Sequence, residues 1–283
     1  MLRPFAMRGA RLLVPCAVAL ALACRGGAPR EEPVRMPSLQ DVPDTAWTEL
    51  AAKRIWFGHQ SVGDDIMAGV RDLAAADPRL GVRVAAGGDA LAGGGGVFAH
   101  ERIGRNGDPG LKTDEFARRL EGPLRGRVDV AFHKYCYADI GEGTDVAAVF
   151  EHYRRTMDRL RAEFPAVVFV HVTTPLVRVQ SGPRALLKRL LGRSPGRYPA
   201  NLARERFNQR MRETYAGREP VFDLAAIEST RPDGRREIVR FGAGSAPALV
   251  PAYTTDGSHL NEAGRRRVAG ALLAFLARLP APR

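Results

Sequence analysis

The sequence predicts one α/β domain, in which helices cover both faces of a parallel β-sheet. Short runs of apolar residues alternate along the chain with segments that have the 3.6-residue periodicity of amphipathic helices. The runs are apolar throughout, which is typical of strands that are buried on both faces. About 235 residues remain after an N-terminal leader and tether, enough for one sizeable core with about five strands.

The first expected strand is residues 54–57, and it leads into a turn that is bounded by Gly58 and Gly63. A helical pattern follows over residues 64–73. Ser61 lies in this turn, so we expect its hydroxyl at the carboxyl edge of the sheet, beside backbone N–H groups and the positive end of a helix dipole. This position suits a nucleophile, and it also suits a serine that only caps the helix.

The alternation continues through the middle of the chain. Further strands are expected at residues 128–132, 166–172 and 220–224, and an arginine-rich helix around residues 201–215. Thr144 and Asp145 can cap another helix, which Phe164 and Pro165 close. The apolar stripe of that helix consists of Val146, Val149, Phe150, Tyr153, Met157 and Leu160.

Near the end of the chain, Asp256 and His259 stand three residues apart on a loop before a helix, for which Asn261 is the expected N-cap. A carboxylate that accepts a hydrogen bond from one imidazole nitrogen leaves the other nitrogen free to deprotonate a nucleophile. Serine needs such a base, so the pair can serve Ser61. A solvated loop pair is the alternative. The apolar face of the helix is Val268, Leu272, Leu276 and Leu279.

The order of these motifs resembles the SGNH (GDSL-type) hydrolase superfamily, over roughly residues 50 to 280. The resemblance implies a three-layer α/β/α sandwich with a flavodoxin-like sheet. It also implies Ser61 as the nucleophile, His259 as the base and Asp256 as the residue that orients the base. In that family, a Gly and an Asn from later loops help to form the oxyanion hole.

Two blocks depart from the pattern of the superfamily. The first block normally reads Gly-Asp-Ser, whereas His59 and Gln60 precede Ser61 here. The third block normally carries an Asn, and residues 133–139 have none. Upstream, Gly104 and Asn106 can supply a backbone N–H and a side-chain amide to an oxyanion. Alternatively, the segment that contains Gly104 and Asn106 is a plain turn, and Asn106 can be a turn residue and an oxyanion donor at once.

Several other residues are candidates for the lining of the site. His59 can hydrogen-bond near the nucleophile or stabilise the turn, Lys134 can offset charge, and Asp139 can hold a loop or the substrate. Cys136 is a small buried hydrophobe or, less simply, a nucleophile. No Cys/His cluster has the spacing of metal ligands, and the run Gly93–Gly96 lacks the Lys of a phosphate loop, so neither a metal nor a cofactor is expected.

The N-terminal leader predicts export. Arg3, Arg8 and Arg11 precede an apolar run that ends at Cys24, as in a secretory signal with a lipobox over residues 1–24, whose Cys24 is lipidated after cleavage. A simple signal peptide or an uncleaved anchor is the alternative, although about twelve apolar residues are few for a spanning helix. Residues 25–45 are expected to be a flexible tether and residues 46–281 the hydrolase-like domain. The expected location is the bacterial cell envelope, in the periplasm or at the outer membrane.

The formal net charge is +12, and it falls to +9 when three arginines leave with the signal. Nucleic acid is not an expected partner, because aromatic residues do not interleave with the charges. Part of the charge gathers in residues 184–197, which form a solvated face, a lid over the site or a patch that meets anionic lipid. Since Cys16 and Cys24 belong to the leader, the cysteines predict no disulfide framework.

Together these features predict an exported serine esterase that is anchored to the membrane by lipid and acts on a carbohydrate acyl ester or a lipid ester. An acyltransferase would use the same acyl-enzyme and differ in the second acceptor. A catalytically silent binding domain of the cell envelope is the alternative from another class, and the two altered blocks favour it.

Overall fold

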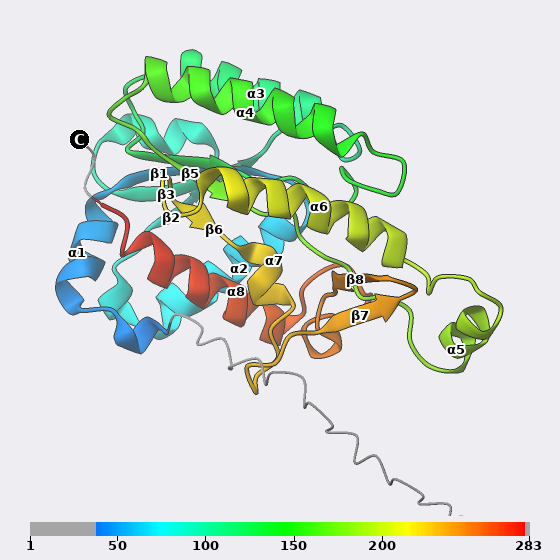
Figure 1. The fold of residues 1–283 in the computed structure, drawn as a ribbon. Coiled ribbons are helices and arrows are strands. Elements are labelled where there is room, and N and C mark those ends of the chain that lie inside the picture. The colour runs from blue at the N-terminus through cyan, green and yellow to red at the C-terminus, as the bar shows by residue number, and fades with distance from the viewer. Residues whose placement is uncertain (1–37, 281–283) are drawn as a thin grey trace, which may run out of the picture. The chain divides into compact units, whose positions relative to one another are not determined.

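The computed structural model describes residues 38–280, which belong to one compact unit (Figure 1). The expected signal peptide, Cys24 and most of the expected tether lie outside the described residues. The last part of the expected tether is ordered. A short 3₁₀ helix, η1 (Leu39–Asp41), is followed by Val42, which is 5% exposed, and α1 begins at Asp44. The packed domain therefore begins some residues before position 46.

Six parallel strands form the central sheet, in the order β2-β3-β1-β4-β5-β6. They are β1 (Arg54–His59), β2 (Val84–Ala86), β3 (Val97–Arg102), β4 (Val130–His133), β5 (Val168–Val172) and β6 (Val221–Phe222). Without the edge strand β2, the order along the chain is 2-1-3-4-5, the flavodoxin-like order. This confirms the predicted α/β class with its parallel sheet. The sequence analysis located four of these strands, and β2 and β3 were not located. β2 consists of three half-exposed residues, and β3 joins buried apolar residues to the polar His100, Glu101 and Arg102, so neither gives an uninterrupted apolar run.

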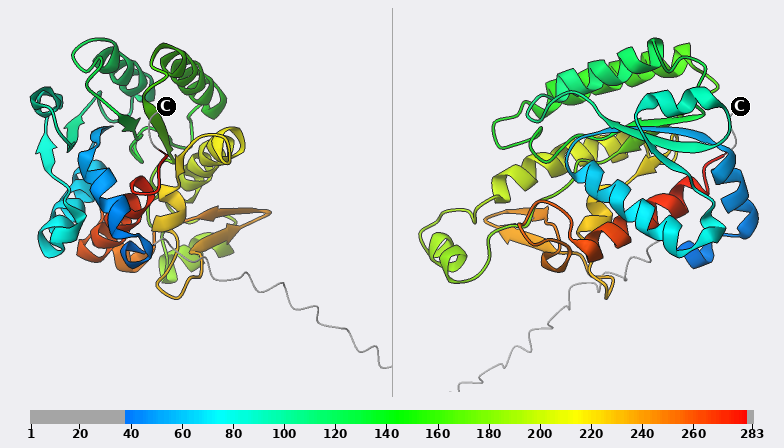
Figure 2. Two further views of the ribbon diagram at one scale, coloured as in Figure 1. Left: turned by 90° about the vertical axis from the view of Figure 1, so that its left-hand side faces the viewer. Right: turned by 180° about the vertical axis from the view of Figure 1, so that it is seen from behind.

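Helices cover both faces of this sheet, as Figures 1 and 2 show. α1 (Asp44–Ala52), α2 (Val62–Ala76), α7 (Leu224–Glu228) and α8 (Glu262–Leu276) share one core cluster with the sheet. α3 (Pro109–Glu121), α4 (Val146–Glu163) and α6 (Tyr198–Tyr215) share the other. Both clusters lie wholly within the described residues.

Alternation along the strands explains the two cores. On β1, Ile55 and Phe57 point into the first cluster, whereas Trp56 points into the second. On β4, Phe132 points into the first cluster and Ala131 into the second. Since successive side chains of a strand face opposite sides, an uninterrupted apolar run is what a strand covered on both faces requires.

Helix boundaries follow the capping residues that the sequence offers. Asp145 accepts a hydrogen bond from the amide of Ala148 at the start of α4, and Asn261 accepts one from Gly264 at the start of α8. The expected apolar face of the last helix is buried, with Leu279 just beyond the end of α8. α6 starts at Tyr198, a few residues earlier than expected, with Pro199 in its first turn.

Outside the sheet, the chain adds a two-stranded antiparallel hairpin and a small helix. These are β7 (Ile238–Phe241), β8 (Gly244–Pro247) and α5 (Pro183–Leu190). Three further 3₁₀ helices are η2 (Pro78–Leu80), η3 (Gly88–Gly93) and η4 (Pro251–Tyr253). Within residues 38–280, no helix combines the length and the apolar character that crossing a membrane requires.

Candidate active site

The sheet itself brings the candidate residues together. In the parallel sheet, β1 pairs with β3 on one side and β4 on the other, with His59 opposite Arg102 and Gly58 opposite His133. The loops after these three strands therefore start at the same edge. They are the Ser61 turn, the Gly104–Asn106 segment and the third block, and the sequence order alone does not reveal that they meet.

Ser61 occupies the turn between β1 and α2 in a strained conformation. Its φ of 43° makes it one of two non-glycine residues with positive φ within residues 38–280. Such a conformation costs about 1–3 kcal/mol and is found preferentially at functional sites. Ser61 stands at the N-cap position, but its side chain makes no capping hydrogen bond. Its Oγ lies instead 2.9 Å from Nε2 of His259, so its hydroxyl is not used as a cap.

His259 is held by Asp256 through its other ring nitrogen, with 2.7 Å between Nδ1 and Oδ2. The second carboxylate oxygen of Asp256 accepts the backbone amides of Ser258 and His259. The hydrogen bond from His259 and these amides hold the pKa of Asp256 well below its usual range. Because an ionised carboxylate only accepts hydrogen bonds, Nδ1 carries the proton, and Nε2 is left to accept the proton of Ser61.

The loop that carries His259 is fixed to the first block. Leu260 donates its amide to Asp65 Oδ2 on the first turn of α2, over 3.1 Å. α8, which follows the loop, packs along α2 in the same core cluster. Two elements about two hundred residues apart in the chain thus place His259 against Ser61, a contact separated by 198 positions.

The part of this edge that carries His259 and Asp256 is open to solvent. The side chains of His259 and Asp256 are 42% and 52% exposed. A cavity of about 430 Å³ adjoins Asp256, and among its other lining residues are Gly257, Arg178 and Arg197. The ring of Tyr137 stands edge-on to His259, with 5.7 Å between the ring centroids. The Asp256–His259 pair is therefore open to solvent, and Ser61 beside it is half-buried.

The Gly104 amide, expected as an oxyanion donor, already has a partner. It donates to Oε2 of Glu115 on α3, over 2.8 Å. The carbonyl of Gly104 accepts the side-chain amide of Gln60, which joins the loop to the Ser61 turn. The position of Gly104 is therefore structural in this arrangement. Glu115 lies in the middle of α3, and its side chain reaches back to the loop that carries Gly104. The motif pattern of the sequence does not predict this contact.

Asn106 is exposed, and the orientation of its side chain is set by Lys112. Nζ of Lys112 lies 3.1 Å from Oδ1 of Asn106, so the oxygen faces the ammonium and the amide NH₂ group points elsewhere. Lys112 itself forms a buried ion pair with Asp139, with 2.5 Å between Nζ and Oδ2. Asn106 thus keeps a donor in a fixed orientation at the sheet edge.

Asp139 holds the second and third blocks together. Besides Lys112, it accepts the amide of Gly107 from one loop and the amide of Cys136 from the other. The carboxylate is only 4% exposed. Of the two roles that the sequence leaves open for Asp139, this geometry matches the one of holding a loop.

Lys134 contacts the Ser61 turn from the interior of the domain and is fully buried. Its Nζ donates to the carbonyl oxygen of Gln60, directly before Ser61, over 3.0 Å. Burial lowers the pKa of Lys134. Cys136 is also buried, and its Sγ lies 3.9 Å from Oγ of Ser61. Both residues contact the Ser61 turn from the interior of the domain. Neither lines the cavity beside Asp256.

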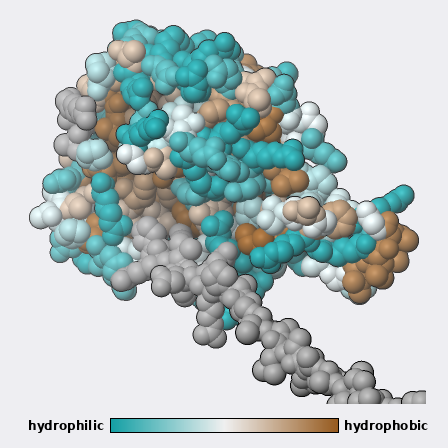
Figure 3. Space-filling model, in the orientation of Figure 1, coloured by the Kyte–Doolittle hydropathy of each residue, from teal (hydrophilic) through white to brown (hydrophobic). Residues whose placement is uncertain are grey.

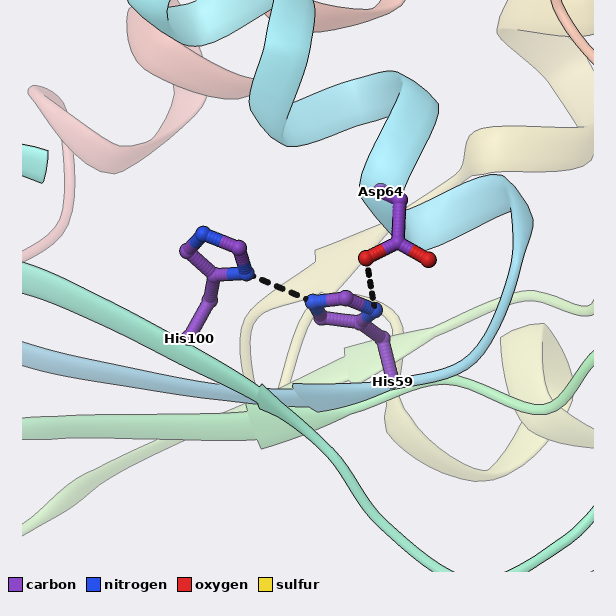
Figure 4. Close-up of side chains that lie close together, drawn as sticks. All are labelled: His59, Asp64 and His100. Carbon is purple, nitrogen blue, oxygen red and sulfur yellow. Dashed lines mark hydrogen bonds and ion pairs between the residues drawn. The ribbon is translucent and has the colours of Figure 1, made fainter. Parts of the chain in front are cut away.

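His59 pairs with His100 and makes no hydrogen bond to Ser61 (Figure 4). Arg71 can only donate, so Nε2 of His100, 2.5 Å from Nη2 of Arg71, accepts. His100 then donates from Nδ1 to Nε2 of His59 over 2.8 Å, and the proton of His59 resides on Nδ1. Burial lowers the pKa of His59 to about 2, and it also lowers the pKa of His100, so both rings are neutral.

His59, Asp64 and His100 are residue types that bind metals, and their potential ligand atoms lie within 4.8 Å of one another. Each is already engaged otherwise. Arg102 holds Asp64 through two hydrogen bonds, and Arg71 holds His100. Two guanidinium groups at such short range oppose a divalent cation. Arg71, His100 and His59 form a hydrogen-bonded chain that supports the end of β1.

Three residues that the sequence did not single out position the site. Arg204 on α6 donates to the carbonyl of Tyr137 and so ties the third block to α6. Arg197 donates to the carbonyl of Gly257 beside Asp256. Asp65, as described, holds the His259 loop. Arg and Asp are common surface residues, and the sequence does not indicate which of them form hydrogen bonds to distant loops. The sequence therefore gave no distinct signal for the roles of these three residues.

No protein-family model and no curated protein matches the chain. Solved structures resemble it at low sequence identity. A member of the lipolytic protein G-D-S-L family from Veillonella parvula is 14% identical, with 80% of this chain and 98% of that chain covered, at a TM-score of 0.45. A two-domain esterase active on acetylated mannans is 14% identical, with 87% and 54% covered, at 0.38. A salicylyl-acyltransferase from a tetracycline biosynthetic pathway is 12% identical, with 81% and 56% covered, at 0.40.

Proposed function

We propose that this chain is a divergent SGNH-type serine hydrolase that cleaves carboxylic esters. One observation carries the proposal. Ser61, His259 and Asp256 are linked by hydrogen bonds of 2.9 and 2.7 Å in the order that base-assisted nucleophilic attack requires. The strained backbone of Ser61 and its place at the start of α2 add to it.

In the proposed reaction, Oγ of Ser61 attacks the ester carbonyl while Nε2 of His259 takes its proton. The ionised Asp256 stabilises the imidazolium that forms. His259 then protonates the leaving alcohol, and an acyl-enzyme remains on Ser61. A water molecule, deprotonated by His259, attacks the acyl-enzyme and releases the acid, which returns Ser61 to its starting state.

The negative charge on the tetrahedral intermediate needs hydrogen-bond donors. We assign this role to the amide NH₂ of Asn106 and to the backbone at the start of α2, whose dipole favours an anion. Gly104 contributes by shaping the loop, because its own N–H donates to Glu115. One oxyanion donor is worth about 10²–10³ in turnover, so activity survives with a reduced set of donors.

The proposed substrate is an ester of the cell envelope, either a carbohydrate acyl ester or a lipid ester. The leader supports this, because its sequence resembles a secretory signal with a lipobox, in which Cys24 would be acylated. The exposed side chains of His259 and Asp256, and the cavity of about 430 Å³ beside Asp256, agree with a substrate that approaches from outside. The proposed location is the periplasm or the outer membrane.

The decisive experiment is labelling by a fluorophosphonate probe of protein that lacks residues 1–24, with Ser61→Ala as the control. We expect labelling that disappears in the variant, because the probe reacts with activated serines. Cys136→Ala, next to Ser61, is a second control and should keep labelling. Folded protein that does not label would overturn the hydrolase proposal.

A catalytically silent binding domain is the second candidate, and the engaged amide of Gly104 favours it. A binder would keep its affinity for an envelope ester in the Ser61→Ala variant and would show no turnover with wild-type protein. The labelling experiment separates the two candidates.

A further inference from the structure

The small helix α5 carries an apolar face with nothing packed on it. Four leucines from the middle of α5 to its C-cap residue are 58–76% exposed, and they are the large hydrophobic residues that stand out as exposed in the described chain: Leu186, Leu187, Leu190 and Leu191. Figure 3 shows hydrophobic residues gathered at the projecting end where Figure 1 places α5. Only Ala185 of the helix is buried. Clustered exposed apolar side chains mark an interaction surface.

The spacing of these leucines places them on one side of the helix, since positions i, i+1, i+4 and i+5 lie on a common face. Cations flank that face. From residue 164 to residue 204 the chain contains no Asp and no Glu, whereas six cations stand in and beside the α5 segment. They are Arg178, Arg184, Lys188, Arg189, Arg193 and Arg197. Within the described residues, none of the six forms an ion pair with a carboxylate such as that of Arg102 with Asp64. Arg189 and Arg197 donate instead to the carbonyl groups of Arg240 and Gly257.

We propose that α5 docks the domain onto an anionic phospholipid surface, with its leucines in the interface and Arg184, Lys188 and Arg193 at the headgroups. An apolar face bordered by Lys and Arg is the pattern of helices that lie in a membrane interface. A second copy of the chain fits this surface poorly, because a two-fold contact would bring the same cations face to face without an acid to pair them.

The position of α5 gives the docking a consequence for the site. A cavity of about 290 Å³ lies between α5 and the β7-β8 hairpin, lined by Ala185, Leu186 and Val239 among others. Arg178 lines both this cavity and the one beside Asp256. Docking through α5 therefore brings a lipid surface close to the cavity at the triad. This inference goes beyond the proposed function, and the docking itself does not depend on a hydrolytic reaction.

Binding to vesicles tests the proposal on a protein of residues 33–283, which contains both core clusters and omits the leader. We expect co-sedimentation with vesicles of phosphatidylcholine and phosphatidylglycerol, and little with phosphatidylcholine alone. Changing all four leucines to Ser should weaken binding at least tenfold while the protein stays folded, because these side chains are already exposed. Unchanged binding in this variant, or no binding by wild-type protein, overturns the proposal.

Charge is tested against a matched control, since a basic protein binds anionic vesicles unspecifically. Lys188→Gln with Arg193→Gln removes two cations of the α5 segment. Arg210→Gln with Arg218→Gln removes two exposed cations at the other end of α6. We expect the first pair to weaken binding several-fold more than the second. Equal effects would show a general charge effect and overturn the assignment to α5.

Fluorescence locates the contact. The two tryptophans of the chain, Trp47 and Trp56, are at most 1% exposed, so they respond little to vesicles. The tryptophan emission of a Leu190→Trp variant should shift to the blue on addition of anionic vesicles, and that of an Arg210→Trp variant should not. Ser61→Ala must bind vesicles like wild type, which separates failure of docking from failure of the hydrolase proposal. Self-association of the protein through the leucines, in place of vesicle binding, would also overturn it.

Discussion

The buried ammonium of Lys134 donates to the carbonyl oxygen of Gln60, 3.0 Å away, immediately before Ser61 in the chain. The second acceptor is the carbonyl of Tyr135, at 3.4 Å. The side chain thus joins the end of β4 to the nucleophile turn. A charged group that is buried among carbonyls acts as a rigid brace for a backbone that is itself strained.

Replacing Lys134 by Met is expected to lower kcat for an ester substrate by about 10²-fold, because a misplaced nucleophile loses alignment with the carbonyl. KM should change little, since Lys134 does not line the open cavity. Steady-state kinetics on a chromogenic ester measure both. Lys134→Arg keeps the charge but not the shape and should recover only part of the loss. A kcat within about twofold of wild type in a folded Lys134→Met protein would contradict the bracing role.

Asp256→Asn should lower kcat by about 10³–10⁴, as the loss of the orienting carboxylate does in triads of this kind. The amide can donate to Nδ1 of His259 and so favour the tautomer that cannot accept the proton of Ser61. The comparison is with Asp65→Asn, which disturbs the loop but leaves the pair intact. A smaller loss in Asp256→Asn than in Asp65→Asn would argue against Asp256 as the residue that orients His259.

Asn106→Ala tests the oxyanion assignment. We expect kcat to fall by about 10²–10³, the range for one lost oxyanion donor, with KM nearly unchanged. Asn106 is exposed, so the variant should fold normally. Arg105→Ala is the matched control on the same loop, because Arg105 is exposed and its ion pair is with Asp108, outside the proposed oxyanion donors. If the two variants were equally active, the oxyanion donor would have to be sought elsewhere.

Acid should destabilise the fold through buried neutral histidines. Burial lowers the pKa of His133 to about 3 and that of His59 to about 2, whereas in the unfolded chain both lie near 6.5. Below pH 6.5 the unfolded chain takes up protons that the folded chain refuses. Stability is therefore complete above pH 6.5 and is lost as the pH falls toward 3. The slope is about 1.4 kcal/mol per pH unit for each histidine.

His133→Phe isolates one of these contributions. The ring of His133 packs against Phe116 and Tyr153, and neither of its nitrogens has a hydrogen-bond partner among the described residues. A phenyl ring keeps the packing and removes the titration. Urea unfolding from pH 7 to pH 4 should show a shallower loss of stability in the variant. An identical pH dependence would mean that His133 is not excluded from protonation in the fold.

The α/β class could be predicted because burial on both faces leaves a local record. The uninterrupted apolar runs around Phe132 and around Val170 indicate strands that are buried on both faces. The apolar stripe of α4 indicates a helix with one buried face. Caps such as Asp145 and Asn261 act within four residues, so the sequence also indicates where these helices begin. Short or half-exposed elements such as β2 leave no such record.

For the site, the sequence by itself determined the residue types and their loops: a serine after the first strand, an Asp and a His before the last helix, and an Asn-containing turn between them. Only the tertiary structure decided which of these meet. Strand order and the packing of α8 on α2 bring His259 to Ser61, while Glu115 takes the amide of Gly104 and Asp139 joins two loops. The physical reason is range: periodicity and capping are local, whereas a hydrogen bond between residues far apart in the chain depends on the packing of every element between them.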